Sequence, residues 1–246
     1  MKEASYAIWG IFMGPRLLPV LALFALPCLA LPGAAAQGMA PAQMTEELDV
    51  IARFFLPGAA VTDMVRGGCS VAYRTKLSRN ADDLALERDM PGIHDKVVAA
   101  ASAHCDAGAD AMLARMHDRI RADWRASTNP ADLHRLAVLF APMVRETDAI
   151  RLQPREGEMM KDTARRIDDA PERGARFEAA QRAFAGSPGG GALLDRVSAY
   201  QDHLRDEINS NEGELGTLVR GGLAAGHRAA NAYAREKGAS MPYPGQ

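Results

Sequence analysis

The sequence has almost no net charge, few cysteines and no recognisable catalytic motif, and each shortage excludes a class of protein. Its 29 basic and 31 acidic residues give a formal net charge of −2 and are interspersed, so bulk charge does not attract nucleic acid. None of the three cysteines has the Cys-x-x-Cys spacing of a redox pair. No segment alternates between apolar and polar residues as a half-buried strand does. These absences leave a helical protein without a sequence-encoded reaction, and we expect no nucleic acid partner.

The first 36 residues have the layout of a secretory signal peptide. An apolar run from Leu17 to Leu31 follows Arg16 and leads to Ala34-Ala35-Ala36, the small residues expected before a cleavage site. Prolines interrupt the run, which is shorter than the ~20 apolar residues that a membrane-spanning helix needs. We therefore predict a signal peptide over residues 1–36, with Met13 as an alternative start. The mature protein is then periplasmic or secreted, with no stable membrane span after cleavage.

Cleavage would remove Cys28 and leave Cys69 and Cys105 in an oxidising compartment, where two remaining thiols usually pair. A disulfide between them closes a loop of about 37 residues and restricts the unfolded state by roughly 3–4 kcal/mol in the chain-entropy model. The alternative is two separate buried thiols, which behave as small apolar side chains. We predict the disulfide, and we expect the helices that follow Asn129 not to depend on it.

Apolar residues recur with the 3.6-residue period of a helix nearly everywhere after the signal peptide. We predict an all-α fold, an irregular bundle of about six to eight helices built from helix-helix hairpins. It forms a single domain over residues 37–240, followed by a C-terminal tail, 241–246. Gly67-Gly68 should end a short helix, and Gly108 should bend or break a long one. The expected helices are 45–56, 59–66, 70–77, 93–126, 176–185 and 212–237, with others starting near Pro130 and Pro188; residues 82–89 are polar and ambiguous.

The predicted core comes from residues that share one face of these helices. The clearest helix start is Asn129-Pro130, where asparagine caps the helix and proline takes its first position. The strongest periodicity belongs to the helix after Pro188. The stripes are Leu48, Ile51, Ala52 and Phe55; Val97, Ala101 and Cys105; Met112, Met116, Ile120 and Trp124; Leu133, Leu136, Ala137, Phe140 and Val144; and Leu193, Val197, Tyr200, Leu204 and Ile208.

A tight corner between two helices is expected at Gly186-Ser187-Pro188, with Ser187 capping the second helix rather than serving as a nucleophile. The corner contains the pattern Phe-x-x-Ser-Pro-x-Gly, formed by Phe184, Ser187, Pro188 and Gly190. Over residues 176–194 this pattern resembles the signature of the bacterial domain of unknown function numbered 2059, although Ala185 stands where that family commonly has tyrosine. The resemblance implies an exported all-helical protein, and it implies no reaction.

Asp202, His203, Asp206 and Glu207 form the best local cluster of metal-ligating side chains, because His203 shares a helix face with the last two. The same pattern describes the solvated side of an amphipathic helix, and we favour that interpretation. His104, beside Cys105, is a second candidate for metal binding or redox tuning, and again we favour a structural role. We therefore predict no catalytic, cofactor-binding or metal-binding residue.

Three functions remain compatible with the sequence. The favoured one is a non-enzymatic scaffold or interaction module of the cell envelope, with a protein partner of unknown identity. The second is a carrier of an apolar ligand, such as a lipid, between its helices. The third is a hydrolase whose residues come together only in three dimensions. A buried cluster of histidine with an acidic residue in a cleft would favour the hydrolase.

Overall fold

The computed structural model describes residues 40–148, 171–210 and 212–243, so the predicted signal peptide with its Cys28 lies outside the described residues. No strand occurs in the part of the chain that the structure describes, and the predicted all-α class is confirmed. No helix of these ranges is both long and apolar enough to cross a membrane. The helices are α2 (Pro41–Phe55), α3 (Gly58–Arg79), α4 (Ala81–Asp89), α5 (Ile93–Ser127), α6 (Pro130–Asp148), α8 (Pro171–Ala185), α9 (Gly190–Asn209) and α10 (Glu214–Glu236).

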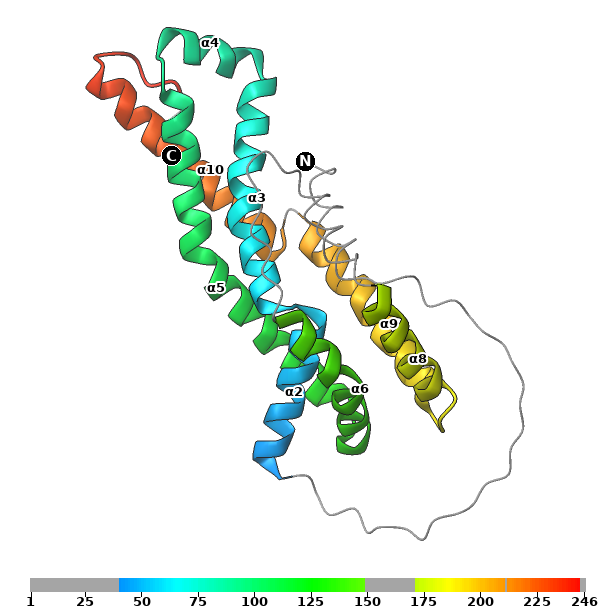
Figure 1. Ribbon diagram of the computed structural model, residues 1–246. Coiled ribbons are helices and arrows are strands. Elements are labelled where there is room, and N and C mark those ends of the chain that lie inside the picture. Colours follow the sequence, from blue (N-terminus) through cyan, green and yellow to red (C-terminus); the bar gives the residue numbers. More distant parts are fainter. Residues whose placement is uncertain (1–39, 149–170, 211, 244–246) are drawn as a thin grey trace.

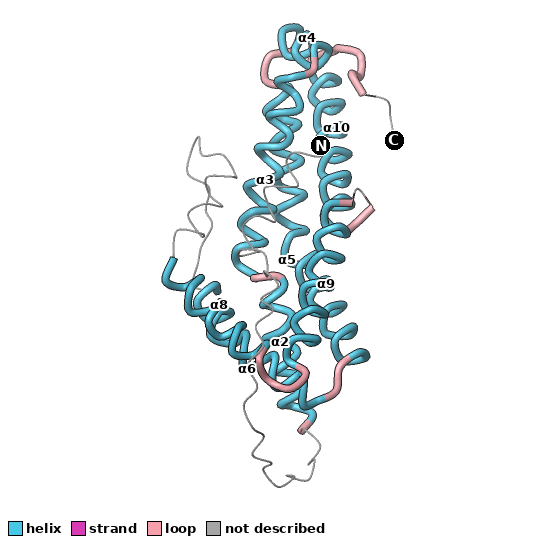
Figure 2. The backbone as a smooth tube through the Cα atoms, turned by 90° about the vertical axis from the view of Figure 1, so that its right-hand side faces the viewer, coloured by secondary structure: helices cyan, strands magenta, loops and turns pink. Residues whose placement is uncertain are grey.

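Helix α5 runs the length of the molecule, and two pairs of shorter helices accompany it (Figure 1). On one side α2 and α3 follow each other along α5; on another, α9 and α10 do the same (Figure 2). Two ion pairs tie the junction of α9 and α10 to α5: Arg119 binds Glu207, and Arg115 binds Glu214 at 2.7 Å. Helices α6 and α8 cover the end of the bundle where α2 lies.

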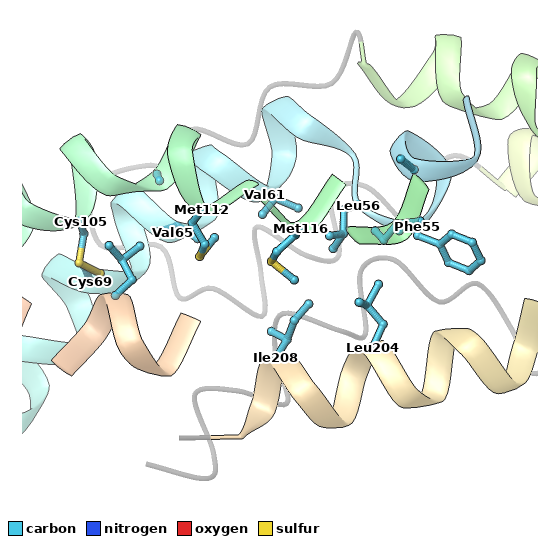
Figure 3. Packing of buried hydrophobic residues seen from close by; sticks show 14 of the residues in the cluster. Phe55, Leu56, Val61, Val65, Cys69, Cys105, Met112, Met116, Leu204 and Ile208 are labelled. Carbon is cyan, nitrogen blue, oxygen red and sulfur yellow. A yellow bond between two sulfur atoms is a disulfide. The ribbon is translucent and has the colours of Figure 1, made fainter. Parts of the chain in front are cut away.

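The predicted stripes form the core. All of their residues are buried except Tyr200, which is partly buried and packs against the others. Figure 3 shows Leu204 and Ile208 of α9 facing Phe55, Leu56 and Met116. Aromatic rings concentrate where α2, α6 and α8 meet, with Phe54 stacked on Phe140 at a centroid distance of 3.6 Å and Phe177 beside both. The periodicity of the sequence therefore located the core correctly.

The prediction of two short helices before Ser78 is wrong, because α3 continues through Gly67-Gly68 without a break. Its buried residues Val61, Val65, Cys69, Tyr73 and Leu77 recur every four positions and face the rest of the core. Helical backbone is accessible to glycine at a cost of about 1 kcal/mol relative to alanine. Burial of five apolar side chains outweighs that cost, so the helix persists.

The prediction of a break at Gly108 is also wrong, since α5 is a single helix of 35 residues. A Cβ atom on Gly108 would lie 2.4 Å from Cδ1 of Leu218, which belongs to α10. The glycine therefore makes room for a neighbouring helix.

Helix α10 approaches α5 closely along a row of small residues, Gly222, Gly226, Ala230 and Ala234, all of them buried. A Cβ atom on Gly226 would lie 2.8 Å from Cγ1 of Val97 and 3.0 Å from its carbonyl oxygen. Such distances are shorter than van der Waals contact, so the separation of the two backbones requires glycine at this position.

Candidate functional site

The structure pairs Cys69 of α3 with Cys105 of α5, as the sequence predicts. Their Sγ atoms are 2.12 Å apart, their Cα atoms are 6.5 Å apart, and both residues are buried (Figure 3). Tyr73 lies one turn after Cys69, and its hydroxyl donates a hydrogen bond to the carbonyl of Val219 on α10. Burial raises the pKa of Tyr73 to about 12, so its hydroxyl keeps its proton. The disulfide therefore sits in a layer of structural contacts.

The prediction that Ser187 caps the start of α9 is wrong. Ser187 does not cap this helix; Gly189, with a φ of +69°, stands at the N-cap without a side-chain hydrogen bond. The hydroxyl of Ser187 donates to the carbonyl of Phe184 at the end of α8 and accepts from Nη2 of Arg135 at 2.8 Å. Arg135 also donates to the carbonyl of Pro188, and its guanidinium lies 4.9 Å from the centroid of the Phe184 ring.

Gly190 completes this corner. A Cβ atom there would lie 1.9 Å from the carbonyl oxygen of Phe184 and 2.6 Å from Oγ of Ser187. The four motif residues thus close a turn that Arg135 of α6 binds from outside. The contacts of Ser187 are those of a structural hydroxyl.

The acidic side chains around His203 form ion pairs with arginines. Asp202 and Asp206 both pair with Arg205, and Glu207 pairs with Arg119 on α5. Within the described ranges, no group of three or more histidine, cysteine or acidic side chains is placed to hold a metal ion. The sequence cluster is therefore not brought together as a ligand set.

His104, the other sequence candidate, lies exposed against α10. A Cβ atom on Gly221 would be 2.4 Å from its Nε2 atom. The ring therefore packs over a glycine of the neighbouring helix.

A polar cluster that sequence analysis missed lies where α4, the start of α5 and the end of α10 meet the C-terminal segment. Its centre is Tyr243, whose ring stacks on that of His227 at a centroid distance of 4.0 Å and an interplanar angle of 7°. The Tyr243 hydroxyl donates to Oδ1 of Asp83 at 3.0 Å. We call the three residues that hold this tyrosine, Asp83, His227 and Asn231, the tyrosine slot.

Asn231 binds the backbone of the same tyrosine on both sides. Its Nδ2 atom donates to the carbonyl of Tyr243 at 2.9 Å, and its Oδ1 atom accepts from the Tyr243 N–H at 3.1 Å. Asn231 and Asp83 are each only 8 % exposed. The slot therefore presents buried polar groups that the tyrosine satisfies.

Neighbouring contacts hold the walls of the slot. Glu87 accepts hydrogen bonds from the N–H groups of Gly92 and His94, at 2.7 and 2.9 Å. Although desolvation acts to raise the pKa of Glu87, these bonds and the nearby His94 lower it overall. His94 in turn binds the carbonyl of Asp83 through Nε2 at 2.8 Å, which ties α4 to the start of α5.

Burial and the bond to Asp83 raise the pKa of Tyr243, whereas burial and the nearby Lys76 lower the pKa of His227. Near neutral pH the slot thus holds an uncharged phenol against an uncharged imidazole. Neither ring then carries a charge into the stack.

A chain reversal at the end of α10 delivers Tyr243 to the slot. Gly238 has a φ of +68°, its N–H donates to the carbonyl of Arg235, and the N–H of Ala239 donates to the carbonyl of Ala234. These two bonds and the left-handed glycine form a Schellman motif. The segment expected to be a simple tail therefore folds back, as far as Tyr243, along the helix that precedes it (Figure 1).

A second polar pair was missed at the opposite end of the bundle. Glu47 of α2 is buried, and its Oε1 atom accepts from Nδ1 of His134 on α6 at 2.7 Å and from Nε2 of Gln43 at 3.0 Å. The carboxylate thus fixes the tautomer of a histidine whose side chain is 53 % exposed. A carboxylate on one ring nitrogen is the geometry that orients a histidine used as a general base.

Comparison with models of protein families, with curated proteins and with solved structures finds no match for this chain. The resemblance of residues 176–194 to the domain of unknown function numbered 2059 stays a prediction.

Proposed function

We propose that this protein is an exported, non-enzymatic helical module that binds another protein in the cell envelope. One observation carries the proposal. The side chains that the sequence offers for chemistry have structural partners: Ser187 binds Phe184 and Arg135, Cys69 is bonded to Cys105, and the acidic residues around His203 pair with Arg205 and Arg119.

Two features support the compartment. The signal peptide pattern of residues 1–36 is typical of export, and a buried disulfide is typical of proteins that fold in an oxidising environment. Neither depends on the identity of a partner, so localisation is testable on its own. N-terminal sequencing of the processed chain is the direct measurement, and recovery of intact protein in the cytosol would contradict export.

The described surface offers three exposed large apolar side chains at which to look for a partner. Leu84 on α4 is 44 % exposed, Val138 on α6 is 61 % exposed and Met241 in the C-terminal segment is 54 % exposed. Single exposed apolar residues are normal on a protein surface, so these positions serve as probes. Leu84 directly follows Asp83, and Met241 lies two residues before Tyr243. Both positions therefore report on the surface next to the tyrosine slot.

The experiment is photo-crosslinking in the envelope of living cells. A photoreactive amino acid replaces Leu84, Val138 or Met241 one at a time, and the exposed Arg125 serves as the matched control position. We expect a discrete protein adduct from at least one of the three and none from position 125.

Two results would overturn the proposal. A lipid or other apolar molecule that stays bound in native mass spectrometry, without protein adducts, would favour the carrier. A hydrolytic activity that disappears in His134→Ala would favour the enzyme, because His134 belongs to the best-placed candidate for a general base.

A further inference from the structure

We propose that the tyrosine slot is a peptide-binding site that takes a Pro-Tyr segment of a partner protein in exchange for the chain's own C-terminal segment. This inference rests on the proposed function, because it names the chemistry of the partner that the module binds. In this structure the slot holds Tyr243 of the same chain, the residue that follows Pro242.

The slot recognises the backbone of the residue that it holds. Asn231 donates to the carbonyl and accepts from the N–H of a single residue, Tyr243. An amide side chain pairs in this way with main chain whose N–H and C=O are free of secondary structure. Every extended peptide has these two groups, so this part of recognition is independent of sequence.

The slot also selects tyrosine at that residue. The His227 ring supplies a flat stacking surface, and Asp83 accepts the phenol hydrogen at 3.0 Å. A phenylalanine would stack equally well and leave the buried carboxylate of Asp83 without this bond, which is costly. A phosphate on the tyrosine would face the same carboxylate and be repelled. The slot is therefore specific for unmodified tyrosine.

The residue before the tyrosine restricts the backbone of the ligand. Proline fixes φ near −65° and pushes the residue before it toward extended backbone, so Pro242 holds Met241 out of a helix. A segment whose backbone is already restricted by proline loses less conformational entropy on binding. A partner segment with proline before tyrosine shares that advantage.

The C-terminal segment that occupies the slot is suited to exchange. Between the helix and Tyr243, the residues Lys237, Gly238, Ser240 and Met241 are exposed, so one residue carries most of the docking. The segment is tied to α10 through the Gly238 turn and can leave the slot without unfolding the helix. A partner peptide then competes with a tethered copy of itself.

The test uses the full-length chain with Tyr243→Ala, which removes the ring from the slot, keeps its walls and leaves only the backbone contact with Asn231 to compete. The probe is a fluorescently labelled peptide of the chain's own sequence, Ala-Ser-Met-Pro-Tyr-Pro-Gly-Gln, and binding is followed by fluorescence anisotropy. We expect Tyr243→Ala to bind this peptide and the unsubstituted chain to bind it at least ten-fold more weakly, because its own segment competes. Replacing the peptide's tyrosine with phenylalanine or phosphotyrosine should weaken binding at least ten-fold.

Two further variants, each combined with Tyr243→Ala, assign the binding to the slot. Asn231→Ala removes the backbone contacts, and His227→Ala removes the stacking surface; each should abolish binding while circular dichroism confirms that helicity is kept. Failure of folded Tyr243→Ala to bind the peptide would overturn the inference, and so would equal binding by the unsubstituted chain. Neither result would change the crosslinking outcome at Val138, so failure of the slot is distinguishable from failure of the proposed function.

Discussion

The hydroxyl of Tyr73 on α3 lies 2.7 Å from the position that a Cβ atom of Gly222 on α10 would occupy. The same position is 3.3 Å from Sγ of Cys105, so α10 packs directly on the layer that contains the disulfide. The expectation that all helices after Asn129 are independent of the disulfide is therefore wrong for α10. It overlooked that a helix more than a hundred residues later returns to this layer.

Gly222→Ala should destabilise the protein by about 1–3 kcal/mol, because the added methyl group overpacks a site bounded by Tyr73, Cys105 and the carbonyl of Ala101. The matched control is Gly174→Ala in α8, where a Cβ atom meets nothing within 4 Å. The control should be neutral or gain up to ~1 kcal/mol from helix propensity. Urea unfolding followed by circular dichroism gives both values. Equal effects at the two positions would mean that α10 does not pack as described.

Reduction of the disulfide, or Cys69→Ser, should lower the free energy of unfolding by roughly 3–4 kcal/mol and leave most of the helix content. Because α10 contacts this layer, its amide hydrogens should exchange faster than those of α6 in the reduced protein. Hydrogen exchange read by mass spectrometry measures the difference. Titration of unreduced, unfolded protein from the envelope should find no reactive thiol in the mature chain, and two per chain would contradict the pairing.

Two adjacent glycines at the α8–α9 corner should respond in opposite ways to substitution by alanine. Gly190→Ala should cost about 1–3 kcal/mol, since its Cβ atom would collide with the carbonyl oxygen of Phe184 at 1.9 Å. Gly191→Ala places its Cβ atom 3.7 Å from the carbonyl oxygen of Ala185, an ordinary contact, and should be neutral or slightly stabilising. Thermal unfolding of the pair is the measurement. A corner that tolerates alanine at 190 would refute the turn described here.

Stability should fall as the pH drops below the ordinary histidine pKa of about 6.5. Burial lowers the pKa of His117, whose Nε2 atom donates to the carbonyl of Leu56 at 2.7 Å, and the pKa of His227 is lowered in the same direction. A histidine with a lowered pKa binds fewer protons when folded, so its contribution is complete above pH ~6.5 and is lost as the pH falls toward the folded pKa.

The variant His117→Gln tests this origin, because glutamine keeps a donor for Leu56 and cannot be protonated. The slope of unfolding free energy against pH, between roughly pH 5 and 7, should be smaller in this variant than in the exposed control His203→Gln. An unchanged slope would place the pH dependence elsewhere.

The main features of the fold were accessible from the sequence because they depend on local periodicity. The stripe Leu133, Leu136, Phe140 and Val144 is buried as predicted, and Asn129 caps its helix by accepting from the N–H of Asp132 at 2.9 Å. The continuity of α3 was missed because the local signal of Gly67-Gly68 was given more weight than the buried row of side chains around it. Tertiary packing overrules local propensity in such cases.

The tyrosine slot was inaccessible for a different reason. Asp83 and Tyr243 are 160 residues apart in sequence, and neither belongs to a spacing pattern that implies contact. The available hint was Gly238, a glycine just past the end of a helix, which is typical of a chain reversal. A reversal brings the following residues back over the helix, but it does not say which side chains receive them.

The row of small residues on α10 will make this helix resemble an active site in a mutational scan. Any substitution at Gly222 or Gly226 enlarges the side chain, and in both places a neighbouring atom already occupies the space. Every substitution at these two positions therefore adds atoms that clash with a neighbour and destabilises the protein. Most surface positions, by contrast, tolerate substitution. Sensitivity to mutation along α10 should accordingly be interpreted as a consequence of the short distance between α10 and α5, and not as evidence of a catalytic site.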